Sequence, residues 1–272
     1  MNSKNTIARK IIFIFIISVF YSCIHQPYSS TNKLYKKQAR NFARALREKP
    51  ADTLFPASFW VGTTNFNMRK PNFVIIHHTA QNTCEQTLKT FTTTQSQVSA
   101  HYVICKDGTI HHMLNDYLRA WHGGIARWGS VTDINSSSIG IELDNNGFET
   151  FTQPQINSLL SLLTSLKKKY GIPASNFIGH EDIAPARKND PNVNFPWKDL
   201  AQNGFGVWYD TTGVMVPQQF DALQALRVVG YNIKDSTAAI KAFKRHFLQA
   251  DNDSILTDCD KKVLISLSER LK

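Results

Sequence analysis

Apolar and polar residues fall into blocks along the chain that predict a mixed α/β domain. Continuous, β-branched apolar runs at 73–77 and 138–143 predict two buried strands. The segments 101–105 and 109–113 flank an Asp-Gly pair and predict a β-hairpin, because Asp-Gly supplies the positive φ that such a turn needs. A further short strand is expected at 176–180.

Two helices are expected between these strands. Asn82 to Glu85 has the spacing of a capping box and predicts a helix that runs towards Val98. Thr152 caps a longer helix that is closed near Gly171. Its apolar face consists of Ile156, Leu159, Leu160, Leu163 and Leu166.

Only helical patterns follow residue 206. Helices are expected at 220–230, 235–247 and 257–271, enough for a small bundle that docks on its neighbour. The predicted fold class is therefore α/β, with a central mixed β-sheet flanked by helices at 51–205 and a small C-terminal three-helix domain at 206–272.

Residues 1–22 have the pattern of an export signal. Three basic residues precede an unbroken apolar run at 11–20, which is shorter than the roughly 20 residues of a membrane-spanning helix. Cys23 follows Phe20-Tyr-Ser, which resembles a bacterial lipoprotein cleavage site where the cysteine becomes lipidated. The alternative is an ordinary signal peptide with an incidental cysteine. We expect an exported lipoprotein on the periplasmic face of a bacterial membrane, the outer membrane being favoured.

A tether at 23–50 follows, and its part at 33–49 predicts a short basic amphipathic helix. Leu34, Phe42 and Leu46 recur on one side, with basic residues elsewhere. This helix would lie on an anionic membrane surface or serve as a solvated spacer.

The basic charge is confined to the N-terminal segment. The chain has 31 Lys and Arg against 21 Asp and Glu, a net charge of +10. Residues 1–50 hold ten of the bases and one acid, so they carry +9 of that charge. The remaining residues are nearly neutral, and no nucleic-acid partner is expected.

Apart from Cys23, the cysteines are Cys84, Cys105 and Cys259, with no CxxC pair. This number and spacing fit neither a disulfide framework nor a zinc ribbon. A bridge between Cys84 and Cys105 is one option, but we favour buried small hydrophobic residues.

Metal-capable side chains follow two of the predicted strands. His77 and His78 end the run at 73–77, and His180 and Asp190 bracket a loop after the strand at 176–180. Two imidazoles and a carboxylate suit Zn²⁺ and leave the fourth position for a water. Strand alternation allows only one of His77 and His78 to face such a site, and spacing alone does not select between them.

Five motifs, in order, resemble the zinc-dependent N-acetylmuramoyl-L-alanine amidases, a family that also includes the peptidoglycan recognition proteins. The motifs are Phe73-Val-Ile-Ile-His-His-Thr-Ala, Ser99-Ala-His-Tyr, Ala120-Trp-His-Gly-Gly, Ser138-Ile-Gly-Ile-Glu-Leu and Gly179-His-Glu-Asp-Ile-Ala-Pro-Ala-Arg-Lys-Asn-Asp-Pro. The C-terminal helices resemble the family's small peptidoglycan-binding modules.

The resemblance implies a role for each matched position. It makes His77, His180 and Asp190 the ligands of one zinc ion per chain. It makes Glu142 the acceptor of the water's proton and Lys188 the cation that steadies the oxyanion. Trp121 and His122 fall in a turn that lies near the substrate cleft in the family, so we expect both to bind substrate by sugar stacking or peptide contact. A structural role for Trp121 is the alternative.

The expected function is hydrolysis of the amide between N-acetylmuramic acid and L-alanine of peptidoglycan stem peptides. Two alternatives are a peptidoglycan receptor without catalysis and an amidase of the same fold that prefers anhydro-muropeptides. The partners expected are peptidoglycan and, through the lipid anchor, a membrane.

Overall fold

The computed structural model describes residues 27–48, 58, 60–250 and 253–271. The chain divides into two compact units, residues 1–62 and 63–272. The helix expected at 33–49 is observed in the first unit as α1 (Ser29–Ala45), without a buried side chain. The predicted signal at 1–22 and the predicted lipidation site at Cys23 lie outside the described residues. Among the described helices, none combines the length and apolar character needed to cross a bilayer.

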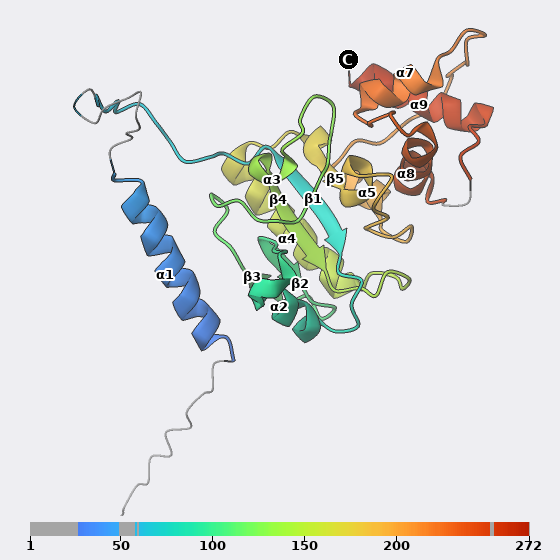
Figure 1. The fold of residues 1–272 in the computed structure, drawn as a ribbon. Helices are drawn as coiled ribbons and strands as arrows, with labels where there is room; N and C mark the ends of the chain where they lie inside the picture. The colour runs from blue at the N-terminus through green and yellow to red at the C-terminus, as the bar shows by residue number, and fades with distance from the viewer. Residues whose placement is uncertain (1–26, 49–57, 59, 251–252, 272) are drawn as a thin grey trace, which may run out of the picture. The chain divides into compact units, whose positions relative to one another are not determined.

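A mixed five-stranded sheet forms the centre of the second unit, in the order β3-β2-β4-β1-β5 (Figure 1). The strands are β1 (Phe73–His78), β2 (Tyr102–Ile104), β3 (Ile110–His112), β4 (Ser138–Leu143) and β5 (Phe177–Gly179). The β2–β3 hairpin is antiparallel, and the other three pairings are parallel. The predicted central mixed sheet flanked by helices is thus confirmed.

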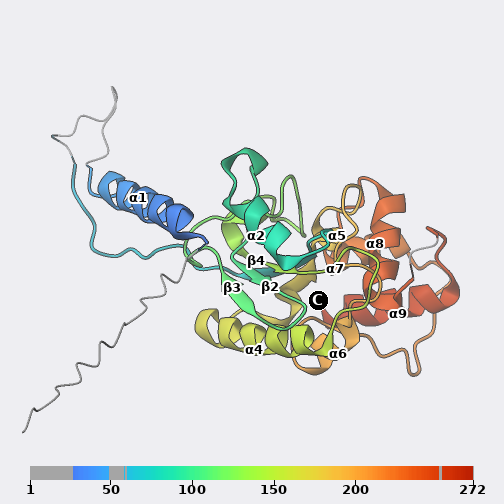
Figure 2. The same ribbon diagram turned by 90° about the horizontal axis from the view of Figure 1, so that it is seen from below.

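Helix α4 (Gln153–Tyr170) covers one face of this sheet (Figure 2). The Thr152 side chain accepts a hydrogen bond from the Gln155 amide at its start, and Gly171 ends it at a φ of 66°. Leu159 and Leu163 are fully buried in the main core, which also contains Val74, Ile76, Ile139 and Ile141 of the central strands. The face that α4 covers is therefore closed to solvent, and a functional site must lie on the other face of the sheet or at one of its edges.

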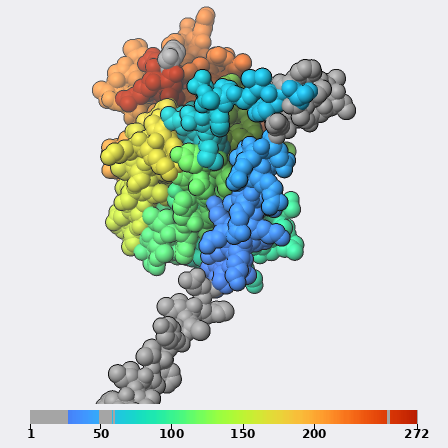
Figure 3. All heavy atoms as spheres, turned by 90° about the vertical axis from the view of Figure 1, so that its left-hand side faces the viewer, coloured from blue at the N-terminus to red at the C-terminus, as the bar shows by residue number. Residues whose placement is uncertain are grey.

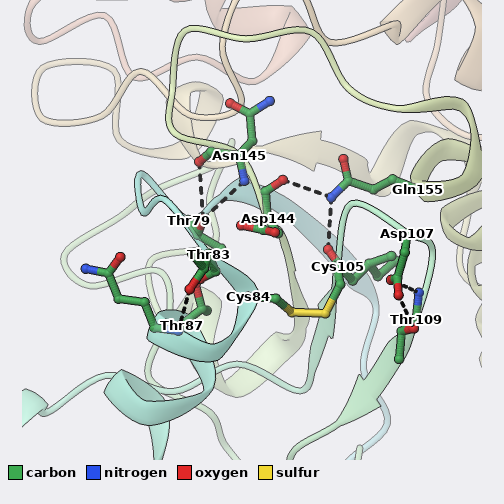
Figure 4. Close-up of a disulfide and its surroundings, with 12 residues drawn as sticks. Thr79, Thr83, Cys84, Thr87, Cys105, Asp107, Thr109, Asp144, Asn145 and Gln155 are labelled. Atoms are coloured by element: carbon green, nitrogen blue, oxygen red, sulfur yellow. Dashed lines mark hydrogen bonds between the residues drawn. A yellow bond between two sulfur atoms is a disulfide. The ribbon is translucent and has the colours of Figure 1, made fainter.

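Helix α2 (Cys84–Thr92) is joined to the sheet by a disulfide between Cys84 and Cys105 (Figure 4). Our preference for two buried free cysteines was therefore wrong. The Cα atoms lie 5.4 Å apart because the start of α2 packs beside the end of β2, a long-range contact that spacing does not reveal. The helix is capped by Thr83 instead of Asn82, and it ends at Thr92, short of Val98.

Several short helices complete the second unit. They are α3 (Ile134–Ser137), α5 (His180–Ile183), α6 (Trp197–Gln202) and the 3-10 turns at Thr94–Ser96 and Ala174–Asn176. The sequence did not predict these elements, since three to six residues are too few to show a helical period.

The three predicted C-terminal helices are observed as α7 (Ala222–Val229), α8 (Ser236–Leu248) and α9 (Asp258–Arg270). They enclose a core of their own around Leu226, Phe243 and Leu264. This C-terminal module adjoins the rest of the second unit, as the orange and red residues show in Figure 3. The boundary expected between residues 205 and 206 stays a prediction, because both sides of it belong to one compact unit and Trp208 packs against both the main core and the core of these helices.

Candidate metal centre

Three parallel neighbours, β4, β1 and β5, bring their carboxyl ends to one edge of the sheet. His77 lies near the end of β1, in register with Glu142 of β4. His180 directly follows β5 as the first residue of α5. The loop after α5 returns to this edge, where the Glu181 amide donates to the Asp190 carbonyl at 2.8 Å. Topology and this backbone bond together bring the four candidate side chains to one place.

The three side chains that we expected to bind metal converge at this edge. His77 Nδ1 lies 2.9 Å from His180 Nδ1 and 3.0 Å from Asp190 Oδ2. His180 Nδ1 is also 3.0 Å from Asp190 Oδ2, so the three atoms form a nearly equilateral triangle. The residues are only 1%, 3% and 6% exposed, respectively. These atoms form a compact, buried group that is able to hold a metal ion.

Strand alternation separates His77 from its neighbour His78. His77 lies on the face of β1 that also carries Phe73 and Ile75, away from α4. His78 lies on the opposite face, where its ring is close to Gly147. The ambiguity between the two histidines is thus resolved by the fold, and only His77 joins the triangle.

The surroundings favour the metal-binding protonation states. Burial, and then the charge of His180, lowers the pKa of His77 to about 4, although Asp190 partly opposes this shift. Burial alone would raise the pKa of Asp190, but the close His180 and His77 rings hold it below its ordinary value. At neutral pH the site therefore offers a neutral imidazole at His77 and a carboxylate at Asp190.

Glu142 is a half-buried residue whose carboxyl group lies beside this triangle. Its Oε2 atom lies in the interior and has no hydrogen-bond partner among the described residues. Burial raises its pKa well above the ordinary value, Asp190 raises it further, and Lys188 lowers it. Glu142 and Lys188 are therefore within electrostatic reach of the predicted ligands, as their expected roles require.

Lys188 is half-buried in the loop between α5 and Asp190. Its amide donates to the carbonyl of Ala184 at 3.0 Å, as does the Arg187 amide at 2.9 Å. These bonds shape the loop so that the Lys188 charge acts on both His77 and Glu142. A cation at this position can balance negative charge that develops at the site.

Trp121 and His122, which we expected to contact substrate, lie in different environments. The Trp121 side chain is half exposed, and its amide is held by the Ser99 hydroxyl at 2.9 Å. His122 is only 8% exposed, and its Nδ1 lies 3.1 Å from Nε2 of His77. The substrate-contact prediction for His122 is corrected, because this ring packs behind a candidate ligand and away from the surface.

A second buried polar cluster joins α5 to the C-terminal module, and sequence reasoning missed it. Asp182 accepts from Tyr231 at 2.6 Å, pairs with His246 at 2.7 Å and accepts from the Gly179 amide at 2.7 Å. Glu181 pairs with Arg245 at 2.8 Å. The detectable signal was two consecutive acids in an otherwise apolar stretch next to His180. We call these residues the α5 clamp; they fix the short helix that begins with a candidate ligand.

Comparisons with known proteins agree with this geometry. Residues 67–193 match the family model described as N-acetylmuramoyl-L-alanine amidase. The chain is 34% identical over 206 residues to N-acetylmuramoyl-L-alanine amidase AmiD of Escherichia coli strain K12, covering 64% of this chain and 74% of that protein. The chain belongs to the N-acetylmuramoyl-L-alanine amidase family. The predicted family and the predicted enzyme class are thereby confirmed.

Other relatives and solved structures of this amidase family extend the likeness. The 1,6-anhydro-N-acetylmuramyl-L-alanine amidase AmpD of Citrobacter freundii is 38% identical over 101 residues, and the match spans 37% of this chain and 54% of AmpD. AmiD from E. coli, solved with anhydro-N-acetylmuramic acid-L-Ala-D-gamma-Glu-L-Lys, superimposes with a TM-score of 0.67 at 29% identity, covering 77% of this chain and 93% of AmiD. AmpDh3 from Pseudomonas aeruginosa superimposes with a TM-score of 0.68 at 28% identity, covering 81% of this chain and 98% of AmpDh3. The fold assigned from the sequence is therefore confirmed beyond the sheet alone.

Proposed function

We propose that this amidase hydrolyses the amide between the lactyl group of N-acetylmuramic acid and L-alanine of peptidoglycan stem peptides, using one Zn²⁺ ion held by His77, His180 and Asp190. The observation that carries the proposal is the buried triangle of two imidazole nitrogens and one carboxylate oxygen beside Glu142. The names of the family and of AmiD support the same bond. A receptor without catalysis is disfavoured, because a full ligand set and a buried carboxyl group would serve no purpose in it.

The residues present fit a zinc ion. His180 Nε2 lies 3.1 Å from the Gly123 carbonyl, which can only accept a hydrogen bond, so Nε2 carries a proton. This leaves Nδ1, which lies 3.0 Å from Asp190 Oδ2, as the ring nitrogen that can bind a metal ion. Ligand atoms about 2.0–2.1 Å from Zn²⁺ in a tetrahedron lie about 3.3 Å apart, close to the 2.9–3.0 Å observed.

When bound, zinc lowers the pKa of a coordinated water towards about 7 and polarises the carbonyl that is attacked. Glu142 takes up the proton of the attacking water at a carboxylate oxygen and delivers it to the leaving nitrogen. Burial raises the pKa of this carboxyl group, whereas the charge of Lys188 lowers it and favours the ionised form that accepts the proton. Lys188 stabilises the negative oxygen of the tetrahedral intermediate, an effect that reaches about 3 kcal/mol for one donor.

Trp121 gives the site a surface for the glycan or the peptide. Its side chain is 50% exposed in the turn that leads to His122, so an apolar sugar face can stack on its ring. Relatives named for 1,6-anhydro-N-acetylmuramyl-L-alanine, and the AmiD structure with an anhydro-muropeptide, support acceptance of anhydro ends by this chain as well. We therefore include anhydro-muropeptides in the proposed substrate class.

The proposal extends to the location of the enzyme. The disulfide between Cys84 and Cys105 supports an oxidising compartment such as the periplasm. Lipidation at Cys23 would tether the chain to the outer membrane, a few residues before α1. Basic residues and the exposed side chains of Leu34, Phe42 and Leu46 give α1 the character of a helix that rests on an anionic bilayer. Cys23→Ser should move the full chain from the membrane to the soluble fraction of expressing cells, and unchanged partition would contradict the anchor.

Metal analysis tests the ligand assignment. The purified protein should contain about one zinc per chain, and His77→Ala and Asp190→Ala should each lose it. Full zinc content in both folded variants would refute these ligands. His78→Ala is the matched control, because it removes the adjacent imidazole on the other face of β1 and should keep the metal.

Mass analysis of digested muropeptides tests the reaction. Release of stem peptides with an L-alanine amino end is expected, from both ordinary and anhydro-muropeptides, whereas intact glycopeptides would support the receptor. Glu142→Gln should keep zinc and lose hydrolysis. Unchanged turnover in this variant would remove Glu142 from the mechanism.

A further inference from the structure

His122 lies in a chain of hydrogen bonds that ends at His77. On one side its Nδ1 is 3.1 Å from His77 Nε2. On the other side its Nε2 is 3.1 Å from the Ser138 hydroxyl. His122 and Ser138 are 8% and 0% exposed, so water does not supply the partners of these atoms.

The direction of each hydrogen bond in this series follows from the bond at Ser138. The Ser138 hydroxyl donates its only proton to the carbonyl of Ile134, 2.6 Å away. It must therefore accept a proton from His122 Nε2. Nδ1 of the neutral His122 ring is then an acceptor, and His77 Nε2 donates to it. This leaves His77 Nδ1 without a proton, and it is the atom that faces His180 and Asp190.

We propose that His122, held by Ser138, is a positioning residue that fixes the tautomer and ring orientation of His77 for metal binding. The inference rests on the zinc site proposed above, and it replaces the substrate-contact role first expected for His122. A partner that holds the outer nitrogen of a ligand imidazole typically changes metal affinity by about 10- to 100-fold. His122 supplies that partner from the neighbouring turn, which also carries Trp121.

Gly140 provides the space that this ring needs. A Cβ atom at Gly140 would lie 2.4 Å from Cγ of His122, far closer than real Cβ contacts. Gly140 stands between Ser138 and Glu142 on the same face of β4, and its register partner on β1 is Ile75. The glycine in the Ser-Ile-Gly-Ile-Glu motif thus serves as a recess in the sheet, into which the His122 ring fits beside the ligand.

The test is zinc affinity of the full-length protein, measured by competition with a chelator of known affinity. His122→Phe keeps a ring of similar size without its nitrogens and should weaken zinc binding by about 10- to 100-fold. Ser138→Ala leaves the His122 ring in place but frees its tautomer, and should weaken binding less. His112→Phe is the control, because His112 lies on β3, stacked on Tyr102 and outside the site. The zinc affinity of this variant should equal that of the wild type.

A second readout separates positioning from general loss of structure. In the zinc-free wild type, long-range ¹H–¹⁵N NMR correlations should place the His77 proton on Nε2, and in His122→Phe this preference should be lost. The inference is overturned if folded His122→Phe binds zinc with wild-type affinity, or if the zinc-free wild type carries the proton on Nδ1. If His122→Phe does not fold, Ser138→Ala decides in the same two measurements. A wild type that binds no zinc would overturn the proposed function itself.

Discussion

Loss of the disulfide between Cys84 and Cys105 should lower the free energy of unfolding by about 3 kcal/mol. The bond closes a loop with a sequence separation of 21. In the chain-entropy relation, a loop of this length restricts the unfolded chain by about 11 cal/mol/K, or about 3 kcal/mol at 25 °C. Replacing both cysteines by alanine removes this restriction and leaves α2 held to the sheet by packing alone.

Urea titration of the oxidised protein and of the double variant measures the difference. The Tm should also fall by roughly 6–12 °C, since 1 kcal/mol corresponds to about 2–4 °C in a chain of this size. Wild type in reductant should behave like the double variant. Cys259→Ala is the control, because Cys259 is an exposed free thiol and its loss should leave stability unchanged.

A double variant within about 1 kcal/mol of the oxidised wild type would refute this expectation, as would a wild type that reductant does not destabilise. Zinc content should stay at one per chain in the double variant, because neither cysteine belongs to the His77, His180 and Asp190 group.

Three further outcomes are expected. Asp116 is buried, which would raise its pKa, but hydrogen bonds from Tyr170, Tyr102 and Lys169 lower it below 3.8. Its carboxylate therefore stabilises the fold above that pH and loses this effect as the pH falls through the lower folded-state pKa. In urea titrations, Asp116→Asn should lower the free energy of unfolding by about 2–3 kcal/mol at pH 7 and by less at pH 3. An equal loss at both pH values would contradict this expectation. Trp121→Ala should raise KM for muropeptides about tenfold with zinc content unchanged, and an unchanged KM would exclude stacking. Tyr231→Phe removes the hydrogen bond to buried Asp182 and should lower stability by about 1.5–3 kcal/mol, whereas an unaltered Tm would show that the α5 clamp does not stabilise the fold.

Sequence patterns located the long elements well because local rules decide them. The continuous apolar run of β4 and the Thr152 and Gly171 caps of α4 gave bounds close to those observed. The predicted end of α2 was wrong by several residues. Thr90, Thr92 and Thr93 bond their hydroxyls back to carbonyls at the end of this helix, and the chain leaves it in an extended conformation at Thr93.

For the site, the sequence predicted only the residues that belong to the recognised motifs. Motif order selected His77, His180 and Asp190, and the parallel register of β1 and β4 then explains why Glu142 lies beside them. His122 was misassigned because its burial depends on a recess at Gly140, in another strand, that no local pattern records. The partners of Asp182 lie 49 and 64 residues away in the chain, so spacing could not predict the α5 clamp either.

The α5 clamp bears on how this enzyme can be engineered. Glu181 and Asp182 are fully buried, and their partners Arg245, His246 and Tyr231 all belong to the C-terminal module. A chain truncated before that module would expose these two acids next to His180 and remove their partners in the module. The module therefore cannot simply be exchanged for another binding domain in order to direct the enzyme to a different cell wall. Any graft must reproduce an arginine, a histidine and a tyrosine at the same places, or replace the two acids together with the module.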